Sequence, residues 1–326
     1  MNIPPGVPAP PRDNQLGRIR QLLEDNTDHA RRFAYEEFFD AASREKLLLC
    51  CSHGANIQAV MTAEFAADGT CWIHGPVINS QACHPQSIRN LVAAVLRIAD
   101  ERDAWLSQSL LNSSSCETAA ALRDCGFQTI ADIELMMRPI DRMAAASGNA
   151  PLETRNYNLR RRDTFCEVLQ ATWQDSYDCV PLLHARSPQE ALESHRHHTD
   201  GDPAAGLWQL ILVDGQPAGV LLMSHLPDEQ ASADESTQVL SACGVEIVYM
   251  GLAPAFRGRG LSRGLLTCAA TTAARFDASF LQLAVDVSNV PALAAYRRAG
   301  FLPQQRIACL GRLHPQRATR AANSQP

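Results

Sequence analysis

Residues 245–266 read VEIVYMGLAPAFRGRGLSRGLL and contain the turn from which the rest of the chain can be interpreted. Val245–Leu252 is rich in β-branched and aromatic residues and Pro254 follows it, which predicts a buried strand that ends there. Arginine and glycine then alternate over residues 257–260, and apolar residues recur at helical spacing from Leu261 onward. The stretch therefore predicts a strand, a glycine-rich turn and a helix.

Such a turn is typical of a phosphate-binding site. The first turn of the helix presents unpaired backbone N–H groups at the positive end of the helix macrodipole. Gly258 and Gly260 let phosphate oxygens approach the backbone, and Arg257 and Arg259 add positive charge beside them. The alternative interpretation is a solvated surface turn with a basic patch, because glycine and arginine are common in loops.

A second stretch downstream favours the binding site. Phe280–Val287 alternates apolar and polar residues, which predicts another strand, and residues 289–301 read NVPALAAYRRAGF, which predicts a helix. Ser288 or Asn289 can cap this helix. Asn289 and Tyr296 are seven residues apart, hence two turns apart on one helical face.

Together the two stretches resemble the acetyl-CoA-binding motifs of the GNAT superfamily of N-acetyltransferases. The pattern [Arg/Gln]-x-x-Gly-x-[Gly/Ala] of that family falls on residues 257–262, with Ser262 in place of Gly or Ala. The second signature of the family falls on Asn289, Ala292, Tyr296, Gly300 and Phe301.

The resemblance implies acetyl-CoA as a co-substrate. It implies that backbone groups of Met250 and Leu252 pair with the pantetheine amides like an added strand, and that the amides of residues 258–262 hold the pyrophosphate. Asn289 would hydrogen-bond the pantetheine arm, cap its helix, or do both. The expected cofactor-binding residues are Met250, Leu252, Arg257, Gly258, Arg259, Gly260, Leu261, Ser262 and Asn289.

Acetylation of an amine requires a base, because an amine with a pKa near 10 is protonated at neutral pH. Glu246 is the expected base: it is a lone carboxylate on an apolar strand, and EIVYMGL resembles the strand that carries a glutamate base in the histone-acetylating branch of the family. The alternative is that Glu246 lies at the solvent end of the strand. The base would then be Tyr249, His225 or bulk water.

Discharge of the CoA thiolate requires a proton donor, and a phenol hydrogen-bonded to the sulfur can supply one. Tyr296 is expected to be this catalytic acid, and its alternative is a core aromatic residue on the inner face of the helix. In the family, the first two helices and their connecting loop line the acceptor pocket. The resemblance therefore implies that Trp173, Tyr177, Asp178 and Cys179 contact the substrate.

The first half of the chain resembles a degenerate copy of the second half. Gly126 and its neighbours match Gly300 and its neighbours, 174 positions apart. At this offset the residues that the second half uses for the cofactor are replaced by Cys83, His84, Gln86, Ser115 and Leu122. The arrangement resembles two-domain members of the family, and the alternative is chance similarity between two α/β halves.

The resemblance implies an α/β (α+β) fold: a mixed, mostly antiparallel sheet flanked by helices, present twice in tandem. The expected divisions are a disordered Pro-rich tail over residues 1–14, a degenerate domain over 15–140, a linker over 141–151, a catalytic domain over 152–313 and a disordered tail over 314–326.

Composition and charge argue against a nucleic-acid-binding, membrane or secreted protein. The net charge of −6 does not favour binding to nucleic acid or anionic membranes. The sequence contains neither a signal peptide nor an apolar run of membrane-spanning length. Eleven cysteines without a CxxC pair favour reduced thiols. These features predict a cytoplasmic protein, and they leave its oligomeric state open.

No metal site is expected. Cys71 and His74 are three apart on a predicted strand and so face opposite ways, which argues against a zinc site with Cys83 and His84. The histidines at positions 195, 197 and 198 are interpreted as a solvated helix end, and the acidic segment 228–238 as a flexible loop.

The sequence thus predicts an acetyl-CoA-dependent N-acetyltransferase that transfers the acyl group directly to a small-molecule or peptide amine, with its active site in the second half. One alternative is a CoA-binding regulatory or scaffold pseudoenzyme, against which the intact Asn289 and Tyr296 argue. Another is acyl transfer to an acceptor that is not an amine.

Overall fold

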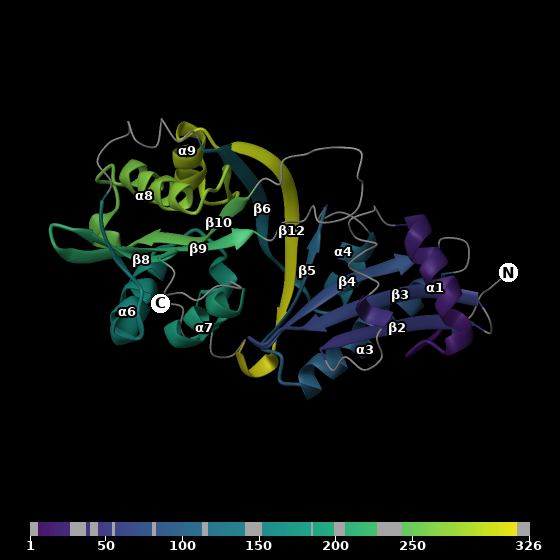
Figure 1. Ribbon diagram of the computed structural model, residues 1–326. Helices are drawn as coiled ribbons and strands as arrows, with labels where there is room; N and C mark the ends of the chain where they lie inside the picture. The colour runs from purple at the N-terminus through teal and green to yellow at the C-terminus, as the bar shows by residue number, and fades with distance from the viewer. Residues whose placement is uncertain are drawn as a thin grey trace, which may run out of the picture. The chain divides into compact units, whose positions relative to one another are not determined.

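The computed structural model describes residues 6–26, 37–39, 45–53, 56–79, 83–112, 117–140, 152–183, 185–198, 206–226 and 243–317 (Figure 1). The chain divides into two compact units, which are unit 1 (residues 1–130 and 307–326) and unit 2 (residues 131–306). The predicted linker 141–151 and the acidic segment 228–238 lie outside the described residues. None of the described helices combines the length and apolar character needed to cross a membrane.

Unit 1 contains a sheet with the strand order β1-β2-β3-β4-β5-β12. Its elements are β1 (Val7–Ala9), α1 (Asp13–Asn26), η1 (Glu37–Phe39), β2 (Lys46–His53), β3 (Asn56–Phe65), β4 (Thr70–Ile78), α3 (Pro85–Glu101), β5 (Leu106–Leu111), α4 (Glu117–Asp124) and β12 (Leu302–Leu313, from Ile307 on). Neighbouring strands are antiparallel except β4 and β5, which are parallel.

Alternation along the strands gives unit 1 two apolar layers. Leu49 and Cys51 of β2 belong to the core that α3 and α4 cover, whereas Leu48 and Cys50 belong to the core that α1 and η1 cover. This is the expected result of side chains that alternate between the two faces of a strand.

Unit 2 contains a sheet with the strand order β6-β11-β10-β9-β8-β7. Its elements are β6 (Gln128–Pro139, from Ala131 on), β7 (Glu153–Asn156), η2 (Leu159–Arg161), α6 (Arg162–Trp173), η3 (Val180–Leu182), α7 (Pro188–His198), β8 (Trp208–Val213), β9 (Gln216–Leu226), β10 (Gly244–Leu252), η5 (Pro254–Phe256), α8 (Ser262–Arg275), β11 (Phe280–Asp286) and α9 (Val290–Arg298). Helices α8 and α9 cover one face of this sheet, and α6 and α7 cover the other (Figure 1). Only β10 and β11 pair in parallel among these strands.

The two halves of the sequence repeat one another at the predicted offset of 174 residues. Strands β4, β5 and β6 begin at Thr70, Leu106 and Gln128, and β10, β11 and β12 begin at Gly244, Phe280 and Leu302. The parallel pair keeps the same register, since Thr70 is opposite Leu106 and Gly244 is opposite Phe280. The predicted fold, a mixed and mostly antiparallel sheet flanked by helices and present twice, is confirmed.

The compact units differ from the predicted division at the last strand of each half. Strand β6 of the first half pairs with β11 over seven residues and belongs to unit 2, whereas residues 308–313 of β12 pair with β5 and belong to unit 1. Each unit therefore completes its sheet with the last strand of the other half of the sequence. A boundary placed at residue 140 would remove β6 from the sheet of unit 2.

The predicted tails also differ from the structure where they are described. Val7–Ala9 forms β1, which pairs with β2, because the N–H of Gly6 is held by Gln58 and Ser87 at 2.9 and 2.8 Å. Residues 13 and 14 already belong to α1. At the other end, a helical turn continues to residue 317, and residues 318–326 lie outside the described part of the chain.

Candidate functional site

The turn between β10 and α8 leaves a row of backbone donors uncovered. Gly258 and Gly260 have φ angles of +71° and +74°, and a Cβ at either position would meet open space. No protein acceptor among the described residues bonds the N–H groups of residues 258–262, and the N-cap residue Leu261 offers no side-chain cap to α8. Uncapped N–H groups at a helix N-terminus form a binding site for an anion such as phosphate.

Arg257 is engaged with the protein backbone. Its guanidinium donates to the carbonyl of Leu252 at the end of β10, and to the carbonyls of Thr172, Gln174 and Asp175 at the end of α6. The distances are 2.9, 2.8, 2.7 and 3.3 Å, respectively. Arg257 therefore joins the end of α6 to the end of β10.

Strands β10 and β11 separate beside this turn. The two strands pair in parallel from Gly244 to Ile247 on β10, and this pairing does not extend to Met250 or Leu252. Val248 is an extra residue in the register with β9, and a bulge of this kind bends its strand and increases the local twist. Met250 and Leu252 are paired with β9 on their other side, so their backbone lies at the open side of the separation.

A cleft of about 540 Å³ follows this separation between β10, α8 and α9. Among the residues predicted from the sequence, Met250, Leu252, Arg257, Gly258, Gly260, Leu261, Ser262, Asn289 and Tyr296 line it, as do Tyr177 and Asp178. Arg259 does not line it: its exposed side chain pairs with Asp214 at 3.4 Å. The local motifs thus come together around one cavity, and Arg259 lies at its outside.

Asn289 lies at the start of α9 and Tyr296 lies seven residues later, and both side chains line this cleft. The Asn289 side chain accepts the N–H of Ala292 at 3.3 Å and so caps α9, while it also lines the cleft. Tyr296 is 9% exposed, and burial raises the pKa of its phenol, followed by the negative charge of Asp178. A phenol held in its protonated form can donate a hydrogen bond into the cleft.

A second cavity of about 250 Å³ lies on the α7 side of the separation. Of the predicted substrate contacts, Trp173, Asp178 and Cys179 line it, whereas Tyr177 lines only the larger cleft. The two cavities share Ser176, Asp178, Tyr249, Ala284 and Val285. The two cavities therefore adjoin at these residues.

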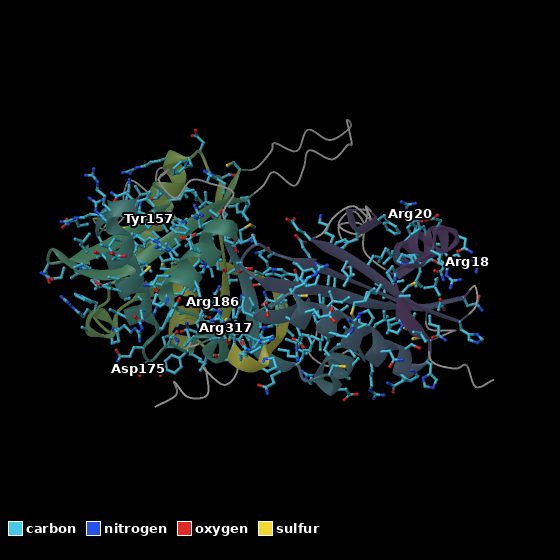
Figure 2. The ribbon with its side chains drawn as sticks, turned by 90° about the horizontal axis from the view of Figure 1, so that it is seen from below. Arg18, Arg20, Tyr157, Asp175, Arg186 and Arg317 are labelled. Carbon is cyan, nitrogen blue, oxygen red and sulfur yellow. The ribbon has the colours of Figure 1, made fainter. Side chains whose placement is uncertain are left out.

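Two basic residues that the sequence did not predict for the site line this second cavity. His195 lines it and lies 5.8 Å from Tyr249 between ring centroids, so it belongs to the cavity wall and not to a solvated helix end. Arg186, from the turn before α7, also lines it (labelled in Figure 2). The helical spacing of the histidines carried no signal for this placement, because it depends on the packing of α7 against β10.

Tyr249 is fixed by a hydroxyl chain from α6. Its phenolic oxygen lies 2.7 Å from Thr172 Oγ1, and that hydroxyl donates to the carbonyl of Leu169 at 2.6 Å. A threonine hydroxyl has one proton, so Tyr249 is the donor of the bond between them. Burial raises the pKa of Tyr249 to about 12, and its phenol is therefore neutral at physiological pH.

The segment that carries Asp178 is anchored to the end of β11. Asp286, which is 6% exposed, accepts the N–H of Cys179 at 3.4 Å and the N–H of Ser288 at 2.9 Å. Asp178 Oδ1 accepts the N–H of Asp286 at 3.3 Å. Burial raises the pKa of Asp178, and the nearby charge of Asp286 adds to this effect.

Glu246 lines neither cavity. It precedes the bulge on β10, opposite Ser224 on β9 and Gln282 on β11, and is partly exposed. His225 also lines neither, and its ring packs on Phe276 with centroids 5.0 Å apart. The structure therefore does not bring the predicted base together with the other predicted site residues.

The equivalent turn of unit 1 is closed by its own residues. The His84 side chain accepts the N–H of Gln86 at 3.1 Å at the start of α3, and Pro85 supplies no N–H. Leu122, the counterpart of Tyr296, is fully buried in the unit 1 core. This helix start lacks the row of uncovered donors seen at α8.

Comparison with known proteins agrees with the geometry of unit 2. Residues 165–301 match the model of the acetyltransferase (GNAT) family. A GCN5-related N-acetyltransferase from Sphaerobacter thermophilus is 17% identical with a TM-score of 0.53, and the match covers 94% of this chain and 95% of that chain. No curated protein sequence matches the chain.

Two further structures are similar over nearly the whole chain. The glucosamine N-acetyltransferase region of a fungal multi-domain β-N-acetylglucosaminidase is 11% identical with a TM-score of 0.52, covering 95% of this chain and 38% of that chain. A tandem GNAT protein from the clavulanic acid biosynthesis pathway is 14% identical with a TM-score of 0.48, covering 94% and 98%. At 17% and 11% identity, the two structures with TM-scores of 0.53 and 0.52 show the fold alone.

Proposed function

Since residues 165–301 carry a domain of the GNAT acetyltransferase family, we propose that the chain is an acetyl-CoA-dependent N-acetyltransferase that acts in unit 2. The observation that supports this most strongly is the pair of connected cavities. One follows the uncovered N–H groups of residues 258–262, and the other meets it at Asp178 and Tyr249. A donor and an acceptor can therefore meet without a covalent intermediate on the protein.

The larger cleft fits a phosphate-bearing thioester. In this proposal the backbone donors of residues 258–262 would bind the pyrophosphate, and the open side of β10 at Met250 and Leu252 would pair with the pantetheine amides. Asn289 has a side chain on the cleft in addition to its capping bond. In this proposal Arg257 contributes to cofactor binding indirectly. Its guanidinium donates to the carbonyls of Leu252 and Thr172 and so fixes the position of the turn.

The transfer itself is direct. The lone pair of the neutral acceptor nitrogen forms a bond to the acetyl carbonyl carbon, the carbon–sulfur bond breaks, and its electron pair remains on sulfur. Tyr296 hydrogen-bonds the thiolate and passes it a proton, and the proton that the acceptor nitrogen loses replaces it on the phenol. The acceptor is a small-molecule or peptide amine.

We also propose a cytoplasmic location. All ten described cysteines carry free thiols. Disulfides form and persist in oxidising compartments, so free thiols favour a reducing one.

A substitution at Gly260 tests the cofactor site, and Gly215 provides a matched control. Both glycines have positive φ angles, +74° and +73°, and a Cβ at either would meet open space. Gly260→Val and Gly215→Val therefore carry a similar backbone strain. Only the side chain at position 260 would stand in the way of a phosphate on the turn.

We expect Gly260→Val to weaken acetyl-CoA binding at least tenfold and Gly215→Val to leave it within about twofold of the parent chain. Isothermal titration calorimetry measures both, and thermal melts check that both variants are folded. Equal affinities in the two folded variants would contradict the assignment of the turn.

A further inference from the structure

Asp178 occupies the junction of the two cavities, which the predicted base Glu246 does not reach. We propose that the second cavity binds a small primary amine, and that Asp178 takes the proton that this amine must lose. This inference rests on the proposed function, which it deepens by naming the acceptor class and the base.

The backbone holds the Asp178 carboxylate in place. Its own N–H donates to Ser176 Oγ at 3.2 Å, and its Oδ1 accepts the N–H of Asp286. The next residue, Cys179, has a φ of +44° and donates its N–H to Asp286 Oδ2. No hydrogen bond of Asp178 Oδ2 is recorded among the described residues. One oxygen thus fixes the carboxylate, and the other can accept from a ligand.

The surroundings of Asp178 favour a cation of limited size. One atom each of Asp178, Cys179 and Asp286 lie within 4.8 Å of one another, which brings two carboxylates to one end of the cavity. Arg186 and His195 also line this cavity, and the rest of the wall is mainly apolar, with Trp173, Leu182 and Leu183 among its residues. A carboxylate pair beside an apolar wall attracts an ammonium group that carries a short apolar body.

The rival groups are less suited to receive the proton. Tyr249 directs its own proton to Thr172, so only its oxygen lone pairs face the cavities, and its raised pKa shows that the phenolate is disfavoured. Cys179 offers a thiol, whereas a carboxylate is already ionised at neutral pH. His195 lies on Tyr249 and lines only the second cavity, away from the larger cleft.

The proton balance of the step is complete. The acceptor enters as an ammonium ion, and one N–H proton moves to Asp178 Oδ2, which gives a neutral amine and a carboxylic acid. The amine attacks the thioester as described above, and the second proton that the nitrogen loses equals the one that the CoA thiolate needs. Asp178 returns its proton to solvent before the next turnover.

Burial raises the pKa of Asp178, and this brings the base closer to the working pH. The charged and titratable residues that line the two cavities with it are Asp175, Tyr177, Cys179, Arg186, His195, Tyr249, Arg257, Asp286, Tyr296 and Arg298. Asp178 acts in its ionised form. The rate should therefore fall as the pH falls through this raised pKa.

The test uses the full-length chain, acetyl-CoA, and three probe amines: butylamine, benzylamine and phenethylamine. Release of the CoA thiol measures transfer, mass spectrometry identifies the acetylated amine, and calorimetry measures acetyl-CoA binding. The variants are Asp178→Asn, which keeps the shape and the accepting oxygen, Glu246→Gln for the rival base, and Asp163→Asn as an exposed acid-to-amide control on α6.

We expect Asp178→Asn to keep its acetyl-CoA affinity within about twofold and to lose about 10²–10⁴-fold in turnover at neutral pH. The loss should shrink as pH rises, because the amine then needs less help, and the acid limb of the wild-type profile should be absent. Asp163→Asn should retain the wild-type turnover and profile.

Three results would overturn the inference. The first is Asp178→Asn turning over at the wild-type rate, and the second is a large loss in Glu246→Gln without one in Asp178→Asn. The third is a wild-type chain that binds acetyl-CoA but acetylates none of the three amines. A chain that fails to bind acetyl-CoA at all would instead refute the proposed function, and the inference with it.

Discussion

At the scale of single residues, Arg257 lies where its motif predicts, but its side chain bonds to the protein backbone. The motif placed this arginine at the phosphate turn, and the structure keeps it there. Its guanidinium nevertheless donates to four backbone carbonyls, of residues 172, 174, 175 and 252. Thr172 lies in the last turn of α6, and residues 174 and 175 follow the end of this helix, where a positive charge is favoured by the helix macrodipole.

Arg257→Gln should therefore lower stability as well as ligand affinity. Charge-assisted hydrogen bonds are lost and carbonyls are left without partners, which predicts a decrease of about 2–3 kcal/mol in the free energy of unfolding. Arg259→Gln is the matched control, because its exposed ion pair with Asp214 contributes about 0–1 kcal/mol. Urea denaturation followed by tryptophan fluorescence measures both. An Arg257 variant with unchanged stability and weakened acetyl-CoA binding would assign the arginine to the phosphate.

Sequence patterns predicted the site residues whose positions depend on local structure. They missed the residues that only tertiary contacts bring to the site. Gly258 and Gly260 were predictable because a turn with positive φ requires glycine, and Asn289 because its capping bond reaches only three residues along the chain. Asp286 and His195 line the same cavity as Asp178 although they lie 286 − 178 = 108 and 195 − 178 = 17 residues further along the chain. Nothing in the spacing of these residues encodes that meeting, so no local pattern could have found it.

At the scale of elements, the contact between α6 and β10 sets the position of the junction. Gly251 makes this approach possible: a Cβ there would lie 2.9 Å from Thr172 Cβ and 3.1 Å from the Tyr249 oxygen. The same two residues hold the hydrogen bond that orients Tyr249. A methyl group at position 251 would therefore push α6 from β10.

Gly251→Ala should destabilise the chain by about 1–3 kcal/mol, since overpacking forces neighbouring atoms to move. Gly17→Ala is a control of opposite sign. Gly17 lies inside α1 with open space around its Cβ position, and alanine is favoured over glycine in a helix by about 0.5–1 kcal/mol. Urea melts of the two variants give the comparison. A Gly251→Ala chain as stable as the parent would show that α6 is not held this closely.

The elements follow from the sequence where the patterns are strong. In β4 (Thr70–Ile78), α6 (Arg162–Trp173) and β8 (Trp208–Val213), apolar residues recur at strand or helix period. β7 and β12 are exceptions. β7 reads ETRN, and the first five residues of β12 are exposed, so neither carries the alternation on which such a prediction depends.

At the scale of the whole molecule, the chain contains the same fold twice, but the two compact units do not coincide with the two halves of the sequence. β6 completes the sheet of unit 2, where Met136 is fully buried and Glu134, which is 3% exposed, pairs with Arg297 at the end of α9 at 2.9 Å. Residues 308–310 of β12 are buried in unit 1. The last strand of each half therefore stabilises the sheet of the other.

This exchange changes which fragment should fold alone. A 150–326 fragment lacks β6, loses its seven paired residues on β11 and the partner of Arg297, and exposes the apolar residues of β12. A 131–306 fragment keeps β6 and omits residues 307–326. We expect only the 131–306 fragment to unfold cooperatively by circular dichroism and to bind acetyl-CoA.

Calorimetric titration of the full chain completes the comparison. Because His84 and Pro85 close the start of α3 in unit 1, we expect about one acetyl-CoA per chain, bound with an affinity similar to that of the 131–306 fragment. A stoichiometry of two would mean that unit 1 holds a phosphate by groups other than the helix start. A folded, binding-competent 150–326 fragment would mean that the strand exchange is dispensable, since unit 2 would then close its sheet without β6.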